Sequence, residues 1–355
     1  MASRDTLSLA PQVAEVARSL GLPATVDCAA AIEDYGERWV DEVVSEFDGE
    51  IQTMDDLLRL ICDNLSVSIE YVRDDDDIDR LAKKHGGWPL DLVLRAEFLN
   101  GDTEGYLTQT PGWRPGDRRC IAFIDARGGR AYRAYFTAWH EVAHLILDGP
   151  DGPAEPHRRT LPNKRGKDPL EVLVDRVAGR IGFYGPIWRL ALETAATEVG
   201  EWGIRSILLA KENAAPLASD KATLLAAVRN APVRCCYVEA GLDYSKAQKK
   251  QMRQAEQPSL FGAAFTANVP IQIPALRLKR VVPGALGSKL RLFKKFRVPI
   301  KSVLAEASVE GFEPREADED MSWWETSSKG HLAPQPVRVH AVNRGGVVYG
   351  LIVER

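Results

Sequence analysis

Residues 135–150 read YFTAWHEVAHLILDGP and contain the motif His-Glu-x-x-His inside an apolar pattern with helical spacing. On an α-helix, residues four positions apart lie on one face, so His140 and His144 can both direct an imidazole nitrogen at a single metal ion. Glu141 follows the first histidine and can accept a proton from a water that such an ion activates. The stretch therefore predicts a mostly buried helix that carries a zinc site.

A plain hydrophobic core is the competing interpretation, because backbone groups can also satisfy the nitrogens of a buried histidine pair. The flanking residues predict that the helix is capped near Thr137 and ends at Gly149-Pro150. These boundaries are compatible with both interpretations. A third ligand elsewhere in the chain would favour the metal site.

The best candidate for that ligand lies in residues 168–181, which read DPLEVLVDRVAGRI. Asp168 is suited to cap a helix and Pro169 to begin it. Glu171 would then supply the third ligand, and Asp175, one turn later, could orient a ligand histidine from behind. Glu171 could also close a capping box with Asp168, and that role does not exclude metal binding.

Other third ligands fit less well. The pattern of the three-histidine peptidases requires Gly at position 147 and His at position 150, but this chain has Leu147 and Pro150. His157, in a polar segment, is an alternative ligand. A side chain that stabilises an oxyanion is also expected near the metal. The sequence does not choose among its candidates, which are Tyr132, Arg133, Tyr135, His157 and Tyr184.

In these two stretches the chain resembles the ImmA/IrrE metallopeptidases. The shared features are Arg-x-x-Phe-Thr at residues 133–137, the His-Glu-x-x-His helix, and a second helix with Glu171, Asp175 and Ala178 that is followed by Pro186. The similarity covers roughly residues 10–190 and is specific in the two helices.

The resemblance implies a zincin-like metallo-endopeptidase in which His140, His144 and Glu171 bind zinc, Glu141 is the general base and Asp175 supports a ligand. Members of the family are cytoplasmic bacterial or phage-related proteases that cut, or otherwise remove, helix-turn-helix transcriptional repressors. The chain departs from the family where VAGRIGFYGP, at residues 177–186, replaces the usual Phe-Ala-x-x-Leu-Leu-Met-Pro run. We therefore expect a different wall of the substrate cleft.

Composition limits the remaining possibilities. A length of 355 residues suits two or three domains, and a net charge of −4 gives no overall attraction for nucleic acid. No apolar run approaches the roughly 20 residues of a membrane-spanning helix, and the N-terminus lacks the features of a secretory signal. The cysteines lack metal-type spacing, which indicates reduced, buried thiols and favours a cytoplasmic location. They are Cys28, Cys62, Cys120, Cys235 and Cys236.

The predicted fold class is α+β. Residues 1–190 are expected to form a zincin-like helical domain with a small, largely antiparallel sheet. Helices are expected at residues 10–20, 28–47 and 54–65, and strands at residues 67–72, 92–98, 105–108 and 121–125. Turns are expected at Asp74 to Asp77, as a solvated acidic run, and at residues 100–102, as a hairpin.

The remainder of the chain is expected to contain three segments. These are a helical region at residues 191–253, a linker at residues 254–274, and a small α+β accessory domain at residues 275–355. Within the last segment we expect an acidic loop at residues 313–320 and a hairpin between residues 337 and 353.

A basic segment at residues 245–301, in which Glu256 is the only acidic residue, supports a second hypothesis besides a solvated surface. On this hypothesis a non-catalytic zincin scaffold binds DNA or a protein partner through the basic segment and the C-terminal domain. The preferred hypothesis is a zinc endopeptidase with a regulatory protein substrate, by resemblance a helix-turn-helix repressor. The same chemistry would also suit the protease of a toxin–antitoxin or phage-defence pair.

Overall fold

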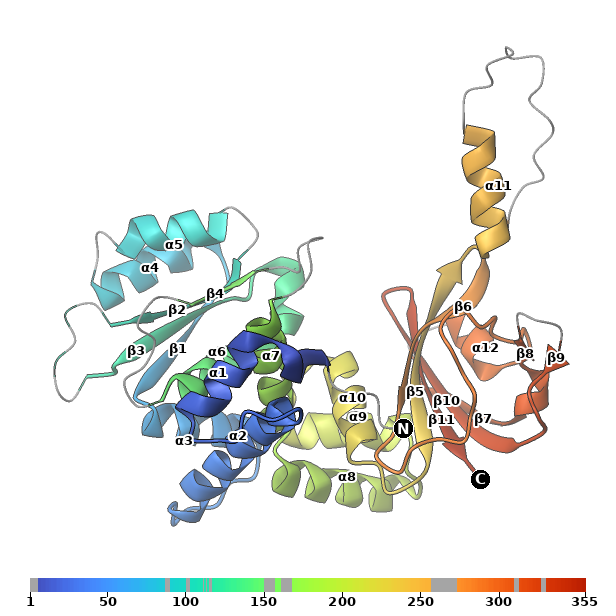
Figure 1. The fold of residues 1–355 in the computed structure, drawn as a ribbon, viewed down its shortest axis with the longest axis horizontal. Coiled ribbons are helices and arrows are strands. Elements are labelled where there is room, and N and C mark those ends of the chain that lie inside the picture. The colour runs from blue at the N-terminus through green and yellow to red at the C-terminus, as the bar shows by residue number, and fades with distance from the viewer. Residues whose placement is uncertain are drawn as a thin grey trace. The chain divides into compact units, whose positions relative to one another are not determined.

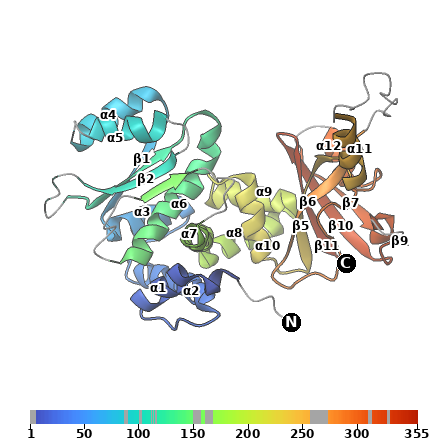
Figure 2. The same cartoon turned by 45° about the horizontal axis from the view of Figure 1, so that its top comes forward.

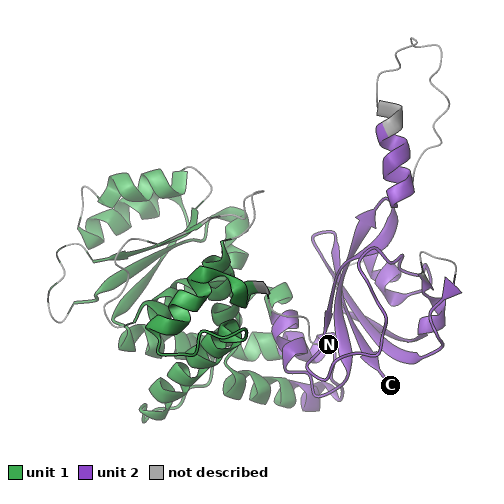
Figure 3. Cartoon of the chain, viewed as in Figure 1, with its two compact units in different colours: residues 1–194, 210–222 green, residues 195–209, 223–355 purple. Residues whose placement is uncertain are grey.

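The fold is mixed α+β, which confirms the predicted class. The computed structural model divides into unit 1, residues 1–194 and 210–222, and unit 2, residues 195–209 and 223–355 (Figure 3). The structure describes residues 6–86, 90–99, 103–110, 112, 114, 117–149, 157–160, 168–256, 273–309, 313–326 and 330–355. None of the helices within these ranges combines the length and the apolar character that crossing a membrane requires.

Three N-terminal helices of unit 1 lie close to their predicted positions: α1 (Pro11–Ser19), α2 (Cys28–Ser45) and α3 (Met54–Asn64). A capping box at Thr53 begins α3, because the Thr53 hydroxyl accepts from the Asp56 N–H and the Asp56 carboxylate accepts from the Thr53 N–H. Helix α2 packs against α7 (Pro169–Ile181), and a Cβ at Gly36 would lie only 2.8 Å from a methyl carbon of Val177. The missing side chain at Gly36 allows this close approach.

The sheet of unit 1 has the strand order β1-β3-β2-β4 (Figures 1 and 2). Strand β1 (Val67–Val72) is parallel to β3 (Cys120–Asp125), whereas β2 (Thr103–Gln109) is antiparallel to both β3 and β4 (His157–Thr160). The sheet is therefore largely antiparallel, as predicted. Helix α6 (Ala131–Asp148), which contains the His-Glu-x-x-His motif, packs on β2 and β3.

Two predictions for the stretch before β2 were wrong. The residues expected as a strand at 92–98 form helix α5 (Leu90–Leu99), whose buried residues Leu90, Leu94 and Phe98 follow the four-residue spacing of a helix face. The acidic run forms the start of helix α4 (Asp75–His85), because the Asp74 side chain accepts a hydrogen bond from the Asp77 N–H. The hairpin turn expected at residues 100–102 lies outside the described residues.

Helices α6 and α7 contain the candidate site. Helix α6 begins at Ala131, so Thr137 is buried inside the helix and does not cap it, contrary to the prediction. Asp168 caps α7 as predicted, and its carboxylate accepts from the Leu170 N–H at 2.9 Å. Glu171, in the first turn of α7, instead directs its carboxylate toward the histidines of α6.

Three helices follow along the chain: α8 (Gly185–Val199), α9 (Ile204–Ala214) and α10 (Asp220–Arg229). Ser219 caps α10, since its hydroxyl accepts from the Ala222 N–H at 3.2 Å. All three helices contain residues of both units.

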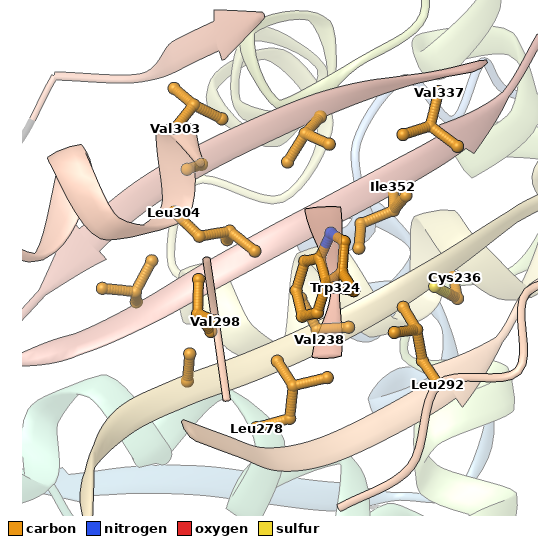
Figure 4. Close-up of a cluster of buried hydrophobic side chains, with 14 of the residues drawn as sticks. Cys236, Val238, Leu278, Leu292, Val298, Val303, Leu304, Trp324, Val337 and Ile352 are labelled. Carbon is orange, nitrogen blue, oxygen red and sulfur yellow. The ribbon is translucent and has the colours of Figure 1, made fainter. Parts of the chain in front are cut away.

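Unit 2 is built on a five-stranded antiparallel sheet with the order β6-β5-β11-β10-β7. Trp324 lies in the hydrophobic cluster of this unit together with Val238, Leu304 and Ile352 (Figure 4). Helix α12 packs on β10 and β11, and the hairpin between these two strands turns at Gly345 and Gly346, as predicted. The remaining elements are α11 and the short strands β8 and β9. The bounds are β5 (Cys235–Asp243), α11 (Lys246–Glu256), β6 (Ala275–Pro283), α12 (Val303–Val309), β7 (Arg315–Asp320), β8 (Glu325–Thr326), β9 (Gly330–His331), β10 (Pro336–Arg344) and β11 (Val347–Glu354).

The segment boundaries expected after residue 190 need correction. The region 191–253 is not wholly helical, because it contains β5, which pairs with β6 and β11. The segment expected as a linker, residues 254–274, therefore connects two neighbouring strands of one sheet, and its residues 257–272 lie outside the described part. The acidic loop expected at 313–320 contains strand β7, where the buried Glu319 carboxylate accepts from the Val303 N–H at 2.8 Å and so caps α12. All five cysteines are free and buried, as predicted.

Candidate metal centre

His140, His144 and Glu171 come together, although Glu171 lies on a different helix. The Nε2 atoms of His140 and His144 are 3.2 Å apart. The two carboxylate oxygens of Glu171 lie 3.2 Å from His140 Nε2 and 3.4 Å from His144 Nε2. Both histidines are buried, while Glu171 is partly exposed. Two imidazole nitrogens and one carboxylate therefore converge on a single point.

Burial and hydrogen bonding set the charges of these groups. Burial lowers the pKa of His144 to about 4, although Glu171 opposes this shift. At His140 burial also lowers the pKa, but hydrogen bonds to Asp175 and Glu171 outweigh it and hold the pKa above its usual value. Burial alone would raise the pKa of Glu171. Its hydrogen bonds to the two histidines outweigh this effect and hold the pKa far below its usual value. Glu171 is thus ionised and His144 neutral at neutral pH, the forms that bind metal.

Asp175 lies behind His140. Its Oδ1 is 3.1 Å from His140 Nδ1, the ring nitrogen that faces away from Glu171. Because the carboxylate accepts a hydrogen bond here, the proton of the neutral ring is placed on Nδ1 and the lone pair on Nε2. This is the contact that the sequence predicts for Asp175.

Glu141 is buried and directly follows His140 on the motif helix. Its side chain is 1% exposed, and neither carboxylate oxygen has a hydrogen-bond partner among the described residues. Burial raises the pKa of Glu141 to about 7. A carboxyl group with this pKa can both accept and release a proton at neutral pH.

Gly105 on β2 forms the wall against Glu141. A Cβ added at this position would lie 2.3 Å from Glu141 Oε1 and 2.8 Å from Thr137 Cγ2. Any side chain here would therefore collide with the carboxylate or displace it. A glycine on this strand allows the sheet to approach the motif helix closely.

His157 borders the site but does not belong to the group of three ligands. Its ring stacks on that of His144, with ring centroids 4.2 Å apart, and its Nε2 is 2.9 Å from Asp148 Oδ2. The hydrogen bond to Asp148 raises the pKa of His157 above its usual value, against the effect of burial. A protonated His157 can thus place a positive charge and a hydrogen-bond donor next to the site.

The other oxyanion candidates have different contacts. The Tyr135 hydroxyl donates to the Gly182 carbonyl, and the Tyr184 hydroxyl donates to Asp41. Arg133 forms an ion pair with Glu104, and Arg133 Nε donates to the Tyr132 hydroxyl at 3.1 Å. Among these residues, His157 is the candidate that contacts a ligand histidine.

Sequence reasoning missed Glu104 and Arg159, which connect to Asp175. Arg159 Nη1 donates to Asp175 Oδ1 at 3.0 Å, and Arg159 Nε donates to Glu104 Oε2 at 3.4 Å. No motif marks either residue, because they become neighbours only through the pairing of β2 with β4. Only a prediction of how β2 pairs with β4 would have placed Glu104 and Arg159 next to each other.

Unit 2 contains another group of possible ligands, Glu201, Glu316 and His340, which the sequence analysis also missed. Here a protein cation already lies beside the carboxylates, since Arg338 approaches Glu201 to 3.8 Å and Glu316 to 3.4 Å. Burial lowers the pKa of His340, and Glu316 lies 3.2 Å from its Nδ1. We interpret this group as an ion-pair network.

No protein-family model matches the sequence, and no curated protein is significantly similar to it. The arrangement of the residues themselves is therefore the basis for a functional proposal.

Replacing Gly105 with Ala should destabilise unit 1, because the new Cβ would lie 2.3 Å from Glu141 Oε1. We expect a loss of about 1–3 kcal/mol in the free energy of unfolding, as is typical of overpacking. Gly129→Ala is the matched control, since a Cβ there would meet no atom within 4 Å. Denaturant unfolding measures both variants, and equal stability of the two would contradict the close packing at Gly105.

Replacing Glu141 with Gln should stabilise the metal-free protein at alkaline pH. Folding raises the pKa of Glu141 from 4.5 to about 7, so the buried carboxylate destabilises the fold increasingly as pH rises through this interval. Gln carries no charge and avoids that cost. We expect the variant to exceed the wild type in unfolding free energy at pH 8, with a smaller difference at pH 5. Unfolding in the presence of a chelator measures this, and a difference independent of pH would refute it.

Proposed function

We propose that this protein is a zinc-dependent endopeptidase in which His140, His144 and Glu171 bind the metal. The proposal depends on the spacing of the three ligands. Donor atoms 2.0–2.1 Å from a tetrahedral zinc ion are about 3.3 Å from one another. The two histidine Nε2 atoms are 3.2 Å apart, close to this value, and each of them lies within 3.4 Å of one of the two Glu171 carboxylate oxygens. Three protein ligands also leave the fourth position open, which is typical of catalytic zinc sites.

Glu141 is the best candidate for the general base. A zinc ion, when bound, would polarise the scissile carbonyl and make a nearby water more acidic. Glu141 would take the proton from the attacking water and later deliver it to the nitrogen of the leaving amine. Its pKa of about 7 suits both transfers, and no described residue forms a hydrogen bond with either of its carboxylate oxygens.

The edge strand β4 supports a peptide as substrate. Among the described strands of unit 1, β4 pairs with β2 alone, and His157 on this strand stacks on the proposed ligand His144. An extended peptide could add to the other side of β4 through backbone hydrogen bonds and would then lie next to the metal ligands.

The resemblance to ImmA/IrrE metallopeptidases supports a helix-turn-helix repressor as the protein substrate and the cytoplasm as the location. The five free, buried cysteines are compatible with a reducing compartment. The shared Arg-x-x-Phe-Thr lead has a structural counterpart, because Arg133 pairs with Glu104 and Phe136 packs beneath Arg159.

Two variants separate metal binding from catalysis. Glu141→Gln should retain zinc and lose about 10²–10⁴-fold in cleavage rate, because it removes the base and none of the ligands. Glu171→Ala should lose the metal. Metal content by mass spectrometry, and fragment formation from a helix-turn-helix protein encoded beside the gene, measure the two effects. Undiminished cleavage by Glu141→Gln would rule out this mechanism.

A group of exposed cations in unit 2 favours the second candidate function, binding of nucleic acid. Between β6 and α12 the side chains of Lys289, Arg291, Lys294, Lys295 and Arg297 are exposed, and none of them forms an ion pair with a described residue. Phe293, 62% exposed, lies among them with its ring 5.7 Å from that of Phe296. Unpaired cations around an exposed aromatic ring are typical of surfaces that bind single-stranded nucleic acid.

Neutralising Lys294, Lys295 and Arg297 to Gln should weaken binding of a single-stranded oligonucleotide. Each lost phosphate contact lowers the slope of log affinity against log salt by about 0.7, so we expect a change of about 2. The control replaces the exposed Arg18, Arg38 and Lys83, which removes the same charge from unit 1. Fluorescence anisotropy at several salt concentrations provides the measurement. Equal effects of the two triple variants would show that only overall charge matters.

A further inference from the structure

Arg159 holds the carboxylate that supports His140. It lies on β4, and its guanidinium donates to Asp175 Oδ1 at 3.0 Å and to Glu104 Oε2 at 3.4 Å. The same group lies over the ring of Phe136, 5.0 Å from the ring centroid. Arg159 thus contacts β2, α6 and α7, and its side chain is only 13% exposed. Contacts on several sides fix its position.

The charges around Arg159 alternate along a series that ends at a proposed metal ligand. Arg133 pairs with Glu104, Glu104 with Arg159, Arg159 with Asp175, and Asp175 with His140. Arg133 and Arg159 balance the carboxylates of Glu104 and Asp175, so these four side chains together carry no net charge. The Glu104 side chain is 5% exposed, and therefore depends on these partners for compensation.

We propose that Arg159 is a positioning residue that fixes His140 for metal binding by holding Asp175; this role rests on the proposed zinc site. Asp175 is 21% exposed and can turn toward solvent if Arg159 is absent. Without the Arg159 guanidinium between them, the carboxylates of Glu104 and Asp175 would repel each other. This repulsion would favour rotation of the Asp175 side chain toward solvent. His140 would lose the acceptor that keeps the proton on Nδ1 and the lone pair on Nε2.

An arginine suits this position better than a lysine would. Its Nη1 and Nε point at different carboxylates, while its planar group covers the Phe136 ring. A lysine ammonium could neutralise the charges but could not hold both contacts at these angles. We therefore expect Arg159→Lys to recover more of the stability than of the Zn²⁺ affinity that Arg159→Ala loses.

The test measures Zn²⁺ affinity of the full chain by competition with a chromogenic chelator. We expect Arg159→Ala to bind about 10–100-fold more weakly than the wild type, which is typical when a supporting partner of a ligand is lost. If Arg159 acts through Asp175, the double variant Arg159→Ala/Asp175→Ala binds no more weakly than Asp175→Ala alone. The absorption spectrum of the Co²⁺-loaded protein should also change in Arg159→Ala, because the geometry at His140 changes.

Arg180→Ala is the matched control, because Arg180 also lies on the metal-binding helix pair but forms its ion pairs with Asp34 and Glu37 of α2, at 2.6 and 2.7 Å. We expect it to lose stability and to keep its Zn²⁺ affinity and Co²⁺ spectrum. Wild-type affinity for Arg159→Ala, or additive losses in the double variant, would overturn the role of Arg159 while leaving the zinc site intact. A wild-type protein that binds neither ion would instead overturn the proposed function.

Discussion

The candidate site depends on the packing of α7 against α6, which places one carboxylate opposite two imidazoles. Leu173, Val174 and Val177 on the apolar face of α7 are completely buried, and the helix packs against both α6 and α2. Burial of each such side chain stabilises the folded protein by roughly 1.5–3 kcal/mol. This is enough to hold α7 in place although its opposite face carries charged residues. Glu171 and Asp175 lie four residues apart on that face, so one helix supplies both a proposed ligand and the carboxylate that contacts His140.

Electrostatic compensation is nearly complete around the site, and Glu141 is the exception. Glu171 has the two histidines, and Asp175 has His140 and Arg159. Glu141 is just as buried and has no hydrogen-bond partner among the described residues, which is a costly arrangement. Uncompensated burial of this kind is common where a group must change its protonation state during function.

The sequence predicted those parts of the structure that depend on local pattern. The motif helix and the Asp168 cap followed from helical spacing and capping chemistry, and the approach of Glu171 was expected because a two-histidine metal site needs a third ligand. Features that depend on strand pairing were missed: Arg159 meets Glu104 only through the register of β4 with β2. Local pattern also misled where composition was ambiguous. Leu90–Leu99 is apolar enough for a strand, and the acidic residues of Arg315–Asp320 concealed an edge strand.

Two residues of β4, His157 and Arg159, connect the sheet to the helices of the candidate site. Side chains two residues apart on a strand point to the same face, so His157 and Arg159 both reach the site. His157 stacks on His144, and Arg159 donates a hydrogen bond to the Asp175 carboxylate behind His140. His144 therefore contacts this strand directly, whereas His140 is linked to it through Asp175 of α7. On the proposed function, a peptide that pairs with β4 would bind the same element that orients the metal ligands, and substrate binding and metal geometry would be mechanically coupled.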